Sequence, residues 1–190
     1  MRLSGAIKPD RPLLVLAVEK EAAHLDGSMP VLLTGMGKVN AAAALAAVLG
    51  RGPLPSAVVN LGTAGALRDG LQGTHEVSRV IQHDLNTAFL YTLTGRTYGA
   101  PLQVGDSGPV LATGDSFISD EAARERLAAH ADLVDMEGYA LAAVAKKLDV
   151  PVRLVKHVSD EAGEGAARTW RESVDDCAKA LAAWARDNLN

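Results

Sequence analysis

Short apolar runs alternate with longer helix-like segments along this chain, and this alternation constrains the fold more than any other feature. Residues 13–18 (LLVLAV) and 57–61 (AVVNL) are almost entirely apolar, as is typical of strands buried on both faces. Further strands are predicted at residues 31–34, 76–82, 110–113, 133–135 and 152–158. Helices are predicted at residues 41–50, 121–130 and 137–148, and in the last segment.

The last segment places Val174, Cys177, Leu181 and Trp184 at spacings of three and four residues, which predicts an amphipathic helix that closes the domain. Strands that alternate with helices form α/β folds with a largely parallel sheet. We therefore predict an α/β fold, with three α/β/α layers around a central, mainly parallel mixed sheet. Residues 1–190 are expected to form one domain.

The charge and composition of the chain limit the kinds of molecule that it is expected to bind. The net charge is −4 and no run of Lys or Arg occurs, so the chain lacks the basic patch expected of a protein that binds nucleic acid or an anionic membrane surface. A small anionic substrate stays possible, because one local Arg or Lys would suffice. Apolar residues make up 48% of the chain but aromatic residues only 4%, and much of the apolar content is alanine, which favours helices packed on a sheet.

Cys177 is the only cysteine, so no intrachain disulfide can form, as is usual in a reducing compartment. Residues 1–11 lack the pattern of a signal peptide. No apolar stretch approaches the ~20 residues that span a bilayer. We therefore expect a soluble, cytoplasmic protein.

The residues that follow the predicted strands are the candidates for a ligand site, because ligands of open α/β sheets bind beyond the carboxyl ends of the strands. They are glycines, small residues, carboxylates and a few apolar groups, a mixture that suits a polar yet partly apolar small molecule. These residues are Glu19–Glu21, Gly35–Gly37, Gly62–Gly65, Gly114–Ile118, Met136–Glu137 and Ser159–Glu161.

Each piece alone also has an ordinary structural explanation. Gly35-Met36-Gly37 lacks the third glycine of a dinucleotide fingerprint and can be a tight turn. Asp160 can be a helix N-cap, and Glu137 can simply favour the start of a helix. Gly105–Pro109 resembles the nucleophile loop of chymotrypsin-like proteases, but no matching His or Asp context occurs, and a turn before residue 110 is favoured. The sequence also lacks a nucleophile elbow, a phosphate loop and a zinc helix, so no metal or organic cofactor is expected.

Taken in order, the set resembles the nucleoside phosphorylase/nucleosidase superfamily. It is most similar to the 5′-methylthioadenosine/S-adenosylhomocysteine nucleosidases and their relatives, which include futalosine hydrolase. The segments that carry the resemblance are AVEKE (17–21), TGMGKV (34–39), NLGTAGAL (60–67), TGDSFI (113–118), VDMEG (134–138) and VSD (158–160).

The resemblance implies a purine nucleoside substrate and a pair of catalytic carboxyl groups. Glu21 would activate the attacking water, and Asp160 would hydrogen-bond to or protonate N7 of the purine with the assistance of Ser159. Cleavage of a glycosidic bond passes through an oxocarbenium-like transition state. A general acid on the leaving base and a general base on the water both lower that barrier.

The resemblance also implies the substrate-binding residues. Phe117 would stack on the base, and the backbone at Ile118 would contact the edge of the base. Met136 and Glu137 would hold the ribose, with Glu137 accepting hydrogen bonds from the hydroxyl groups. Three small residues would line the sugar and nucleophile side: Thr63, Ala64 and Gly65.

Alternatives remain at this point. Phosphorylases of the superfamily carry a Gly/Arg-rich phosphate loop after strand one and an Arg before the glycine after strand three, where this chain has Glu19–Glu21 and Asn60. We therefore favour hydrolysis over phosphorolysis. Because both Glu21 and Asp160 are present, we also favour catalysis over a non-catalytic nucleoside-binding protein. The segments 21–35 and 95–108 are short, and no helix is predicted in the second, so the 5′ substituent is left open. A homodimer is suggested by the resemblance alone.

Overall fold

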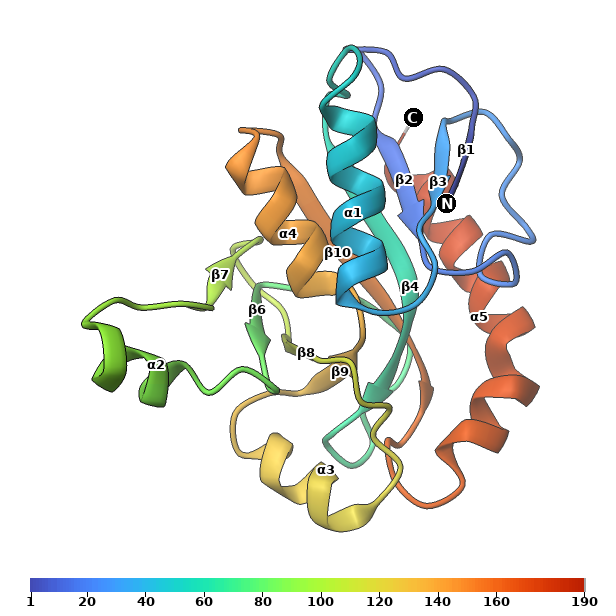
Figure 1. Ribbon diagram of the computed structural model, residues 1–190. Coiled ribbons are helices and arrows are strands. Elements are labelled where there is room, and N and C mark those ends of the chain that lie inside the picture. The colour runs from blue at the N-terminus through green and yellow to red at the C-terminus, as the bar shows by residue number, and fades with distance from the viewer. Residues whose placement is uncertain (190) are drawn as a thin grey trace.

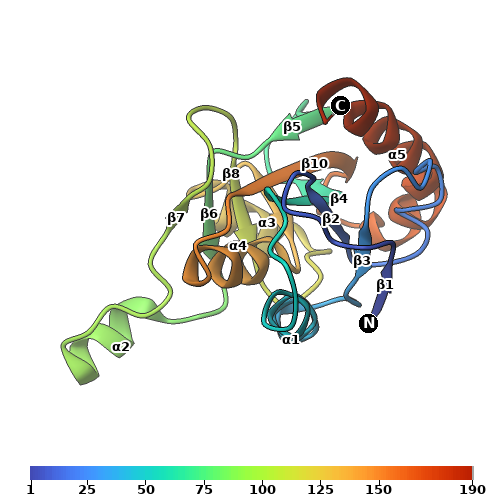
Figure 2. The same cartoon turned by 90° about the horizontal axis from the view of Figure 1, so that it is seen from above.

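The computed structural model describes residues 1–189 as a mixed sheet between two layers of helices (Figures 1 and 2). Its ten strands are β1 (Arg2–Ser4), β2 (Leu13–Leu16), β3 (Val31–Leu33), β4 (Val58–Ala66), β5 (Thr74–Glu76), β6 (Arg79–Gln82), β7 (Leu102–Gln103), β8 (Val110–Thr113), β9 (Leu133–Asp135) and β10 (Val152–Asp160). The helices are α1 (Lys38–Leu49), α2 (Thr87–Thr94), α3 (Glu121–Ala128), α4 (Gly138–Lys147) and α5 (Ala166–Asn188). The predicted α/β class is confirmed.

The two longest strands, β4 and β10, pair in parallel and form the spine of the sheet. On its other edge β4 pairs with β2 near its start and with β9 near its end. The strand order is β1-β3-β2-β4-β9-β8-β6-β7, and β10 carries β5 on its outer edge. Parallel pairs join β2 to β3, β2 to β4, β6 to β8 and β8 to β9. The pairs β1–β3, β5–β10, β6–β7 and β4–β9 are antiparallel.

Both faces of the sheet are buried, which explains why the strands are apolar throughout. In β2, Leu13 and Val15 belong to a core shared with α1 and α4, whereas Leu14 and Leu16 pack with Leu181 of α5 on the opposite face. Alternate side chains point to opposite faces of a strand, so a strand between two helical layers needs an apolar residue at each position. The predicted stripe of α5 is confirmed, since Val174, Cys177 and Leu181 are buried.

Several predicted boundaries were wrong. Residues 76–82 do not form one strand, because β5 pairs with β10 while β6 pairs with β8. Strand β10 runs two residues beyond the predicted end. Helix α2 and strands β1 and β7 were not predicted. Helix α2 has local signals, however: the Asn86 side chain accepts a hydrogen bond from the backbone N–H of Phe89 (3.0 Å), and Gly95 ends the helix with φ +67°.

Helix α2 sits on an arm that projects away from the rest of the molecule (Figures 1 and 2), and none of its residues is buried. Helix α3 lies at the end of the sheet near β8 and β9 (Figure 1). Within residues 1–189, no helix combines the length and the apolar character needed to cross a bilayer.

Candidate active site

The site lies where β4 changes partners. Strand β2 pairs with β4 as far as Asn60, and β9 joins the same edge at Gly65. Between these two pairings, the backbone N–H of Thr63 donates to Oε1 of Glu21 (2.8 Å). A buried backbone N–H needs an acceptor, and here a side-chain carboxylate provides it in place of a neighbouring strand. The change of partner thus opens the sheet at its centre and fixes Glu21 there.

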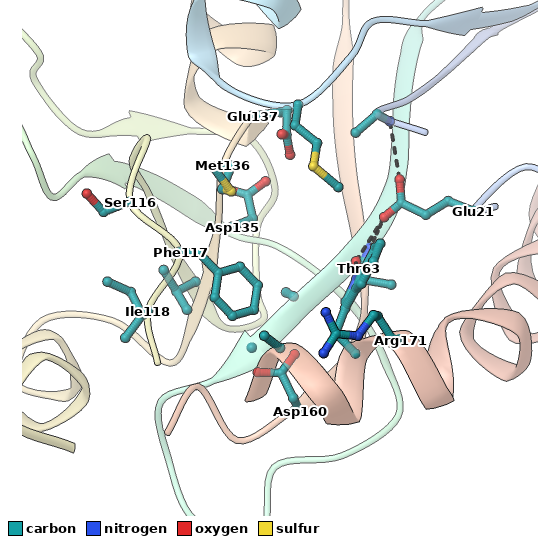
Figure 3. A pocket seen from close by; sticks show the side chains of 17 residues that line it. Glu21, Thr63, Ser116, Phe117, Ile118, Asp135, Met136, Glu137, Asp160 and Arg171 are labelled. Atoms are coloured by element: carbon teal, nitrogen blue, oxygen red, sulfur yellow. Dashed lines mark hydrogen bonds between the residues drawn. The ribbon is translucent and has the colours of Figure 1, made fainter. Parts of the chain in front are cut away.

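A cavity of about 270 Å³ opens at this point (Figure 3), close to the lower end of the ~300–1,000 Å³ range of small-molecule sites. Nearly all the residues predicted to bind or act on the substrate line it: Glu21, Thr63, Ala64, Gly65, Phe117, Ile118, Met136, Glu137 and Asp160. Ser159 does not line the cavity, but its hydroxyl contacts Asp160. Trp170 and Arg171 of α5 also line the cavity, and the sequence analysis missed both.

Glu21 is held by hydrogen bonds to both of its carboxylate oxygens. Oε1 accepts from the Thr63 N–H and from the Thr63 hydroxyl (2.9 Å), and Oε2 accepts from the backbone N–H groups of Ala17 and Val18 (both 3.3 Å). The indole Nε1 of Trp170 donates to the same Thr63 hydroxyl (2.9 Å). Because an indole N–H can only donate, the Thr63 proton is directed to Glu21. The side chain is therefore fixed in one orientation at the cavity wall.

Asp160 occupies the end of β10 and is buried. Its Oδ2 accepts from the Ser159 hydroxyl (2.8 Å), and its Oδ1 accepts from the Ala162 N–H (2.9 Å). Burial raises the pKa of Asp160 above its ordinary value, although these hydrogen bonds oppose the rise. Helix α5 begins only at residue 166, so Asp160 is not the N-cap that the sequence left open.

Glu137 is the N-cap residue of α4, and its Oε1 accepts from the backbone N–H of Gly37 (2.7 Å). Burial, with the neighbouring charge of Asp135, raises the pKa of Glu137 to about 8. Gly37 has φ +93°, a conformation that favours glycine. The glycine turn at residues 35–37 thus serves to aim a backbone donor at Glu137.

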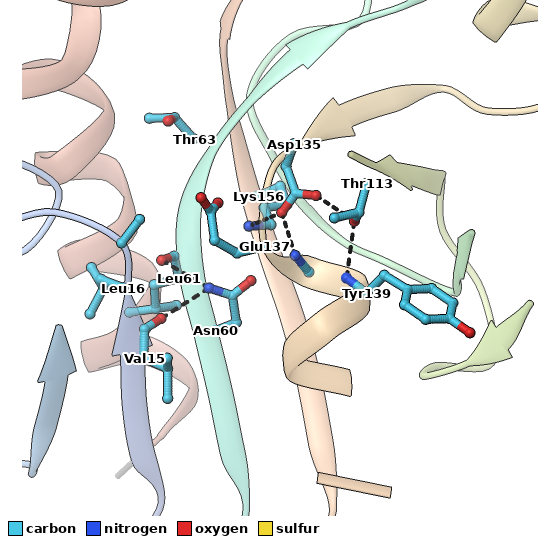
Figure 4. Close-up of polar contacts among 12 residues, drawn as sticks. Val15, Leu16, Asn60, Leu61, Thr63, Thr113, Asp135, Glu137, Tyr139 and Lys156 are labelled. Atoms are coloured by element: carbon cyan, nitrogen blue, oxygen red, sulfur yellow. Dashed lines mark hydrogen bonds and ion pairs between the residues drawn. The ribbon is translucent and has the colours of Figure 1, made fainter. Parts of the chain in front are cut away.

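A buried ion pair lies under the cavity, and the sequence analysis missed it (Figure 4). Lys156 Nζ lies 2.8 Å from Asp135 Oδ2, and both side chains are almost completely buried. Asp135 also accepts from the Thr113 hydroxyl (2.6 Å) and from the Gly138 N–H (2.8 Å). Burial lowers the pKa of Lys156, but the charges of Asp135, Glu137 and Glu21 outweigh burial and raise it. The lysine thus stays charged among three carboxyl groups.

Asn60 is the residue that the resemblance sets against an arginine of the phosphorylases. Its amide Nδ2 donates to the carbonyl oxygen of Val15 (3.0 Å) (Figure 4), and the side chain is buried. It does not line the cavity and brings no positive charge to it. Of the residues described, none form a cluster of His, Cys, Asp or Glu suited to a metal ion.

Comparisons with known proteins identify the family to which this chain belongs. The phosphorylase superfamily model matches residues 106–187. The 5′-methylthioadenosine/S-adenosylhomocysteine nucleosidase of Geobacillus sp. (strain WCH70) is 30% identical over 204 residues, which cover 93% of this chain and 87% of the relative. The chain belongs to the 5′-methylthioadenosine/S-adenosylhomocysteine nucleosidase family.

Two solved structures from Helicobacter pylori share the fold of this family member. The methylthioadenosine/adenosylhomocysteine nucleosidase, in complex with a substituted pyrrolidin-3-ol, has a TM-score of 0.79 at 19% identity, with coverage of 94% of this chain and 97% of the other. A futalosine hydrolase mutant has a TM-score of 0.80 at 18% identity, with coverage of 93% and 97%. Backbone similarity at this level shows the fold and does not distinguish the two activities.

Proposed function

We propose that this family member hydrolyses the N-glycosidic bond of a purine nucleoside of the methylthioadenosine/adenosylhomocysteine type, releasing the free base and a ribosyl product. The observation that carries the proposal is the placement of two buried carboxyl groups, Glu21 and Asp160, at separate walls of one cavity (Figure 3). Their surroundings differ, and this difference suits one of them to act as a base and the other as an acid.

Asp160 is the proposed general acid. The departing purine is a poor anion, and a proton delivered to N7 makes it a better leaving group. A raised pKa favours the protonated form that this role needs. The Ser159 hydroxyl, 2.8 Å from Oδ2, orients the carboxyl group in the cavity.

Glu21 is the proposed general base. As the bond to the base breaks, positive charge develops on the ribosyl ring, and a water molecule on the opposite face attacks the anomeric carbon. Glu21 takes up the proton of this water. Its four hydrogen-bond donors are the backbone N–H groups of Ala17, Val18 and Thr63 and the Thr63 hydroxyl, and they hold the carboxylate in place for that transfer.

The remaining cavity residues suit the two halves of a nucleoside. Phe117 is 46% exposed over the cavity, so its ring can stack on a purine. Met136 and Glu137 enter from the end of β9 and the start of α4, where the Glu137 carboxyl group can hydrogen-bond to ribose hydroxyls. Gly65 cannot carry a larger side chain, since a Cβ there would lie 2.9 Å from Ala162 Cβ and 3.1 Å from Asp160 Oδ1.

Water is favoured over phosphate as the nucleophile by the charge of the cavity. Phosphate beside Glu21 would be repelled, and the buried Asn60 amide does not supply the arginine of the phosphorylases. We propose no metal and no organic cofactor.

We also propose a homodimer that involves the α2 arm. Phe89, Tyr91 and Leu93 are 60%, 56% and 68% exposed on this arm, and apolar side chains gathered on one exposed element are typical of an interface. A cytoplasmic location is proposed on the ground that the only cysteine, Cys177, is a free buried thiol.

A substrate panel tests the proposed reaction. Methylthioadenosine, adenosylhomocysteine, adenosine, inosine and futalosine are incubated with the protein, and free base is followed by chromatography. We expect fastest release from a 5′-thioether nucleoside, and a loss of about 10²- to 10⁴-fold in Asp160→Asn. Full turnover by Asp160→Asn would overturn the assigned acid. Binding without base release from any substrate would favour a nucleoside sensor.

A further inference from the structure

Arg171 is the only basic residue among those described that line the cavity. It lies in the first turns of α5 (Figure 3), next to Trp170, whose indole N–H is bound to Thr63. This hydrogen bond ties the start of α5 to the cavity wall and so fixes the place from which the arginine side chain reaches the cavity. The side chain is exposed, so it lies at the rim and not in the buried interior.

The charge of Arg171 is not used within the protein. Arg68, Arg124 and Arg153 each pair with a carboxylate, whereas Arg171 makes no hydrogen bond or ion pair within residues 1–189. Two carboxyl groups on the cavity wall already have donors of their own. Glu21 is bound by Thr63 and the backbone, and Asp160 is bound by Ser159 and Ala162.

Among the described residues, no unpaired cation lies inside the cavity, because the buried Lys156 beneath it is paired with Asp135. A negative group on a ligand would therefore be attracted to the arginine at the rim. The proposed function places the base at Phe117 and Asp160 and the ribose at Glu137. The wall of α5, with Trp170 and Arg171, is then left for the 5′ substituent.

We propose that Arg171 recognises a carboxylate at the end of the 5′ substituent, so that the enzyme prefers nucleosides with an anionic 5′ arm over neutral ones of the same size. This inference rests on the proposed function, which sets the direction of the substrate in the cavity. A guanidinium group binds a carboxylate through two parallel hydrogen bonds. At an exposed rim we expect a preference of about tenfold in kcat/KM, from a charge-assisted hydrogen bond partly screened by water.

The test compares two matched substrates. One is adenosine with a 5′-(2-carboxyethyl)thio arm, and the other is the primary amide of the same arm, which has nearly the same size and no charge. Base release is measured for the wild type, Arg171→Gln and Arg171→Lys. Arg168→Gln is the control, because Arg168 is an exposed arginine on the same helix that does not line the cavity. Methylthioadenosine is included as a measure of the proposed reaction itself.

We expect the ratio of kcat/KM for acid over amide to be about ten in the wild type and in Arg168→Gln, to fall to about one in Arg171→Gln, and to be intermediate in Arg171→Lys. A ratio near one in the wild type, or a ratio unchanged in Arg171→Gln, would overturn the inference. A loss by the same factor for acid, amide and methylthioadenosine would also overturn it, since Arg171 would then serve the shared machinery.

The two proposals fail in different ways. If methylthioadenosine is not cleaved at all, the proposed reaction fails, and the dissociation constants of the acid and the amide are measured by calorimetry instead. If the wild type binds the acid more tightly than the amide and Arg171→Gln binds both equally, the anion site is upheld. Equal affinities for the acid and the amide in the wild type would overturn it.

Discussion

The buried carboxyl groups of the cavity differ in the donors that surround them. Glu21 accepts four hydrogen bonds, whereas Glu137 accepts one from Gly37 and lies beside Asp135. A buried carboxyl group beside another acid is destabilised in its charged form, so Glu137 is expected to make the stability of the fold depend on pH.

The raised pKa of Glu137 predicts a pH-dependent cost to stability. The pKa rises from 4.5 in the unfolded chain to about 8 in the fold, so this group favours folding below pH ~4.5 and loses that contribution as pH rises toward 8. Glu137→Gln should match the wild type near pH 4.5 and be more stable at pH 8–9 by about 2–4 kcal/mol. Urea unfolding at both pH values measures this difference. The exposed Glu172→Gln is the control, and a Glu137→Gln variant no more stable than the wild type at pH 9 would contradict the shift.

The hydrogen bond from Trp170 to Thr63 predicts an effect on the catalytic step. Trp170→Phe keeps an aromatic ring but removes the N–H donor, so the Thr63 hydroxyl can turn away from Glu21. We expect kcat to fall about three- to tenfold, as for the loss of one hydrogen bond, with little change in KM. Trp184→Phe, on the same helix but stacked against Arg153 away from the cavity, should not lower kcat. Equal kcat values for Trp170→Phe and the wild type would show that the orientation of Thr63 does not depend on the indole.

At the scale of elements, the glycine turn before α1 connects two distant parts of the site. The N–H groups of Gly37 and Lys38, at the start of α1, donate to Glu137 and Asp115 (both 2.7 Å). The turn itself follows β3, whereas Asp115 follows β8 and Glu137 follows β9. These two hydrogen bonds therefore join the ends of β3, β8 and β9 around one cavity.

Gly37→Ala should impair both stability and activity. The residue has φ +93°, and an added Cβ would lie 3.2 Å from Asp115 Oδ1. We expect a loss of about 1–2 kcal/mol and a drop in kcat/KM as the donor to Glu137 shifts. Gly27→Ala is the matched control, because Gly27 also has a positive φ (+77°) but open space around it. It should lose stability only. Activity lost to the same degree in both variants would argue against a specific role for the turn.

Elements that depend on local pattern could be predicted from sequence, and those that depend on distant partners could not. Burial accounts for the apolar runs of β2 and β4 and for the apolar stripe of α5. Because ligands of open α/β sheets bind beyond the carboxyl ends of the strands, Glu21, Glu137 and Asp160 could be predicted to share one site. Residues 76–82 form one continuous pattern, yet the two halves pair with different strands. Lys156 interrupts an apolar strand, and this was an available signal, but its partner Asp135 lies on another strand.

In helix α5, one part could be predicted from the local sequence pattern and another part could not. Its helical spacing identified the face buried on the sheet, including Leu181. The spacing carried no information on the first turns, where Trp170 bonds to Thr63 of β4 and Arg171 reaches the cavity.

In the whole molecule, the α2 arm projects from the body and carries three exposed aromatic or apolar side chains, Phe89, Tyr91 and Leu93 (Figure 1). We expect the protein to sediment as a dimer, and Leu93→Glu to shift it toward the monomer, because a charge in an apolar interface is costly. Analytical ultracentrifugation measures this shift. Leu54→Glu is the control, since Leu54 is an exposed apolar residue (42%) away from the arm. A monomeric wild type would contradict the proposed assembly.

Whether water or phosphate attacks the sugar is decided by the rate of adenine release from methylthioadenosine in phosphate-free buffer and in buffer with phosphate, with identification of the sugar product. The proposed roles of Glu21 and Asp160 predict equal rates in both buffers and an unphosphorylated sugar in each. Adenine release that requires phosphate and yields a ribosyl 1-phosphate would contradict them and leave Glu21 without a water to activate.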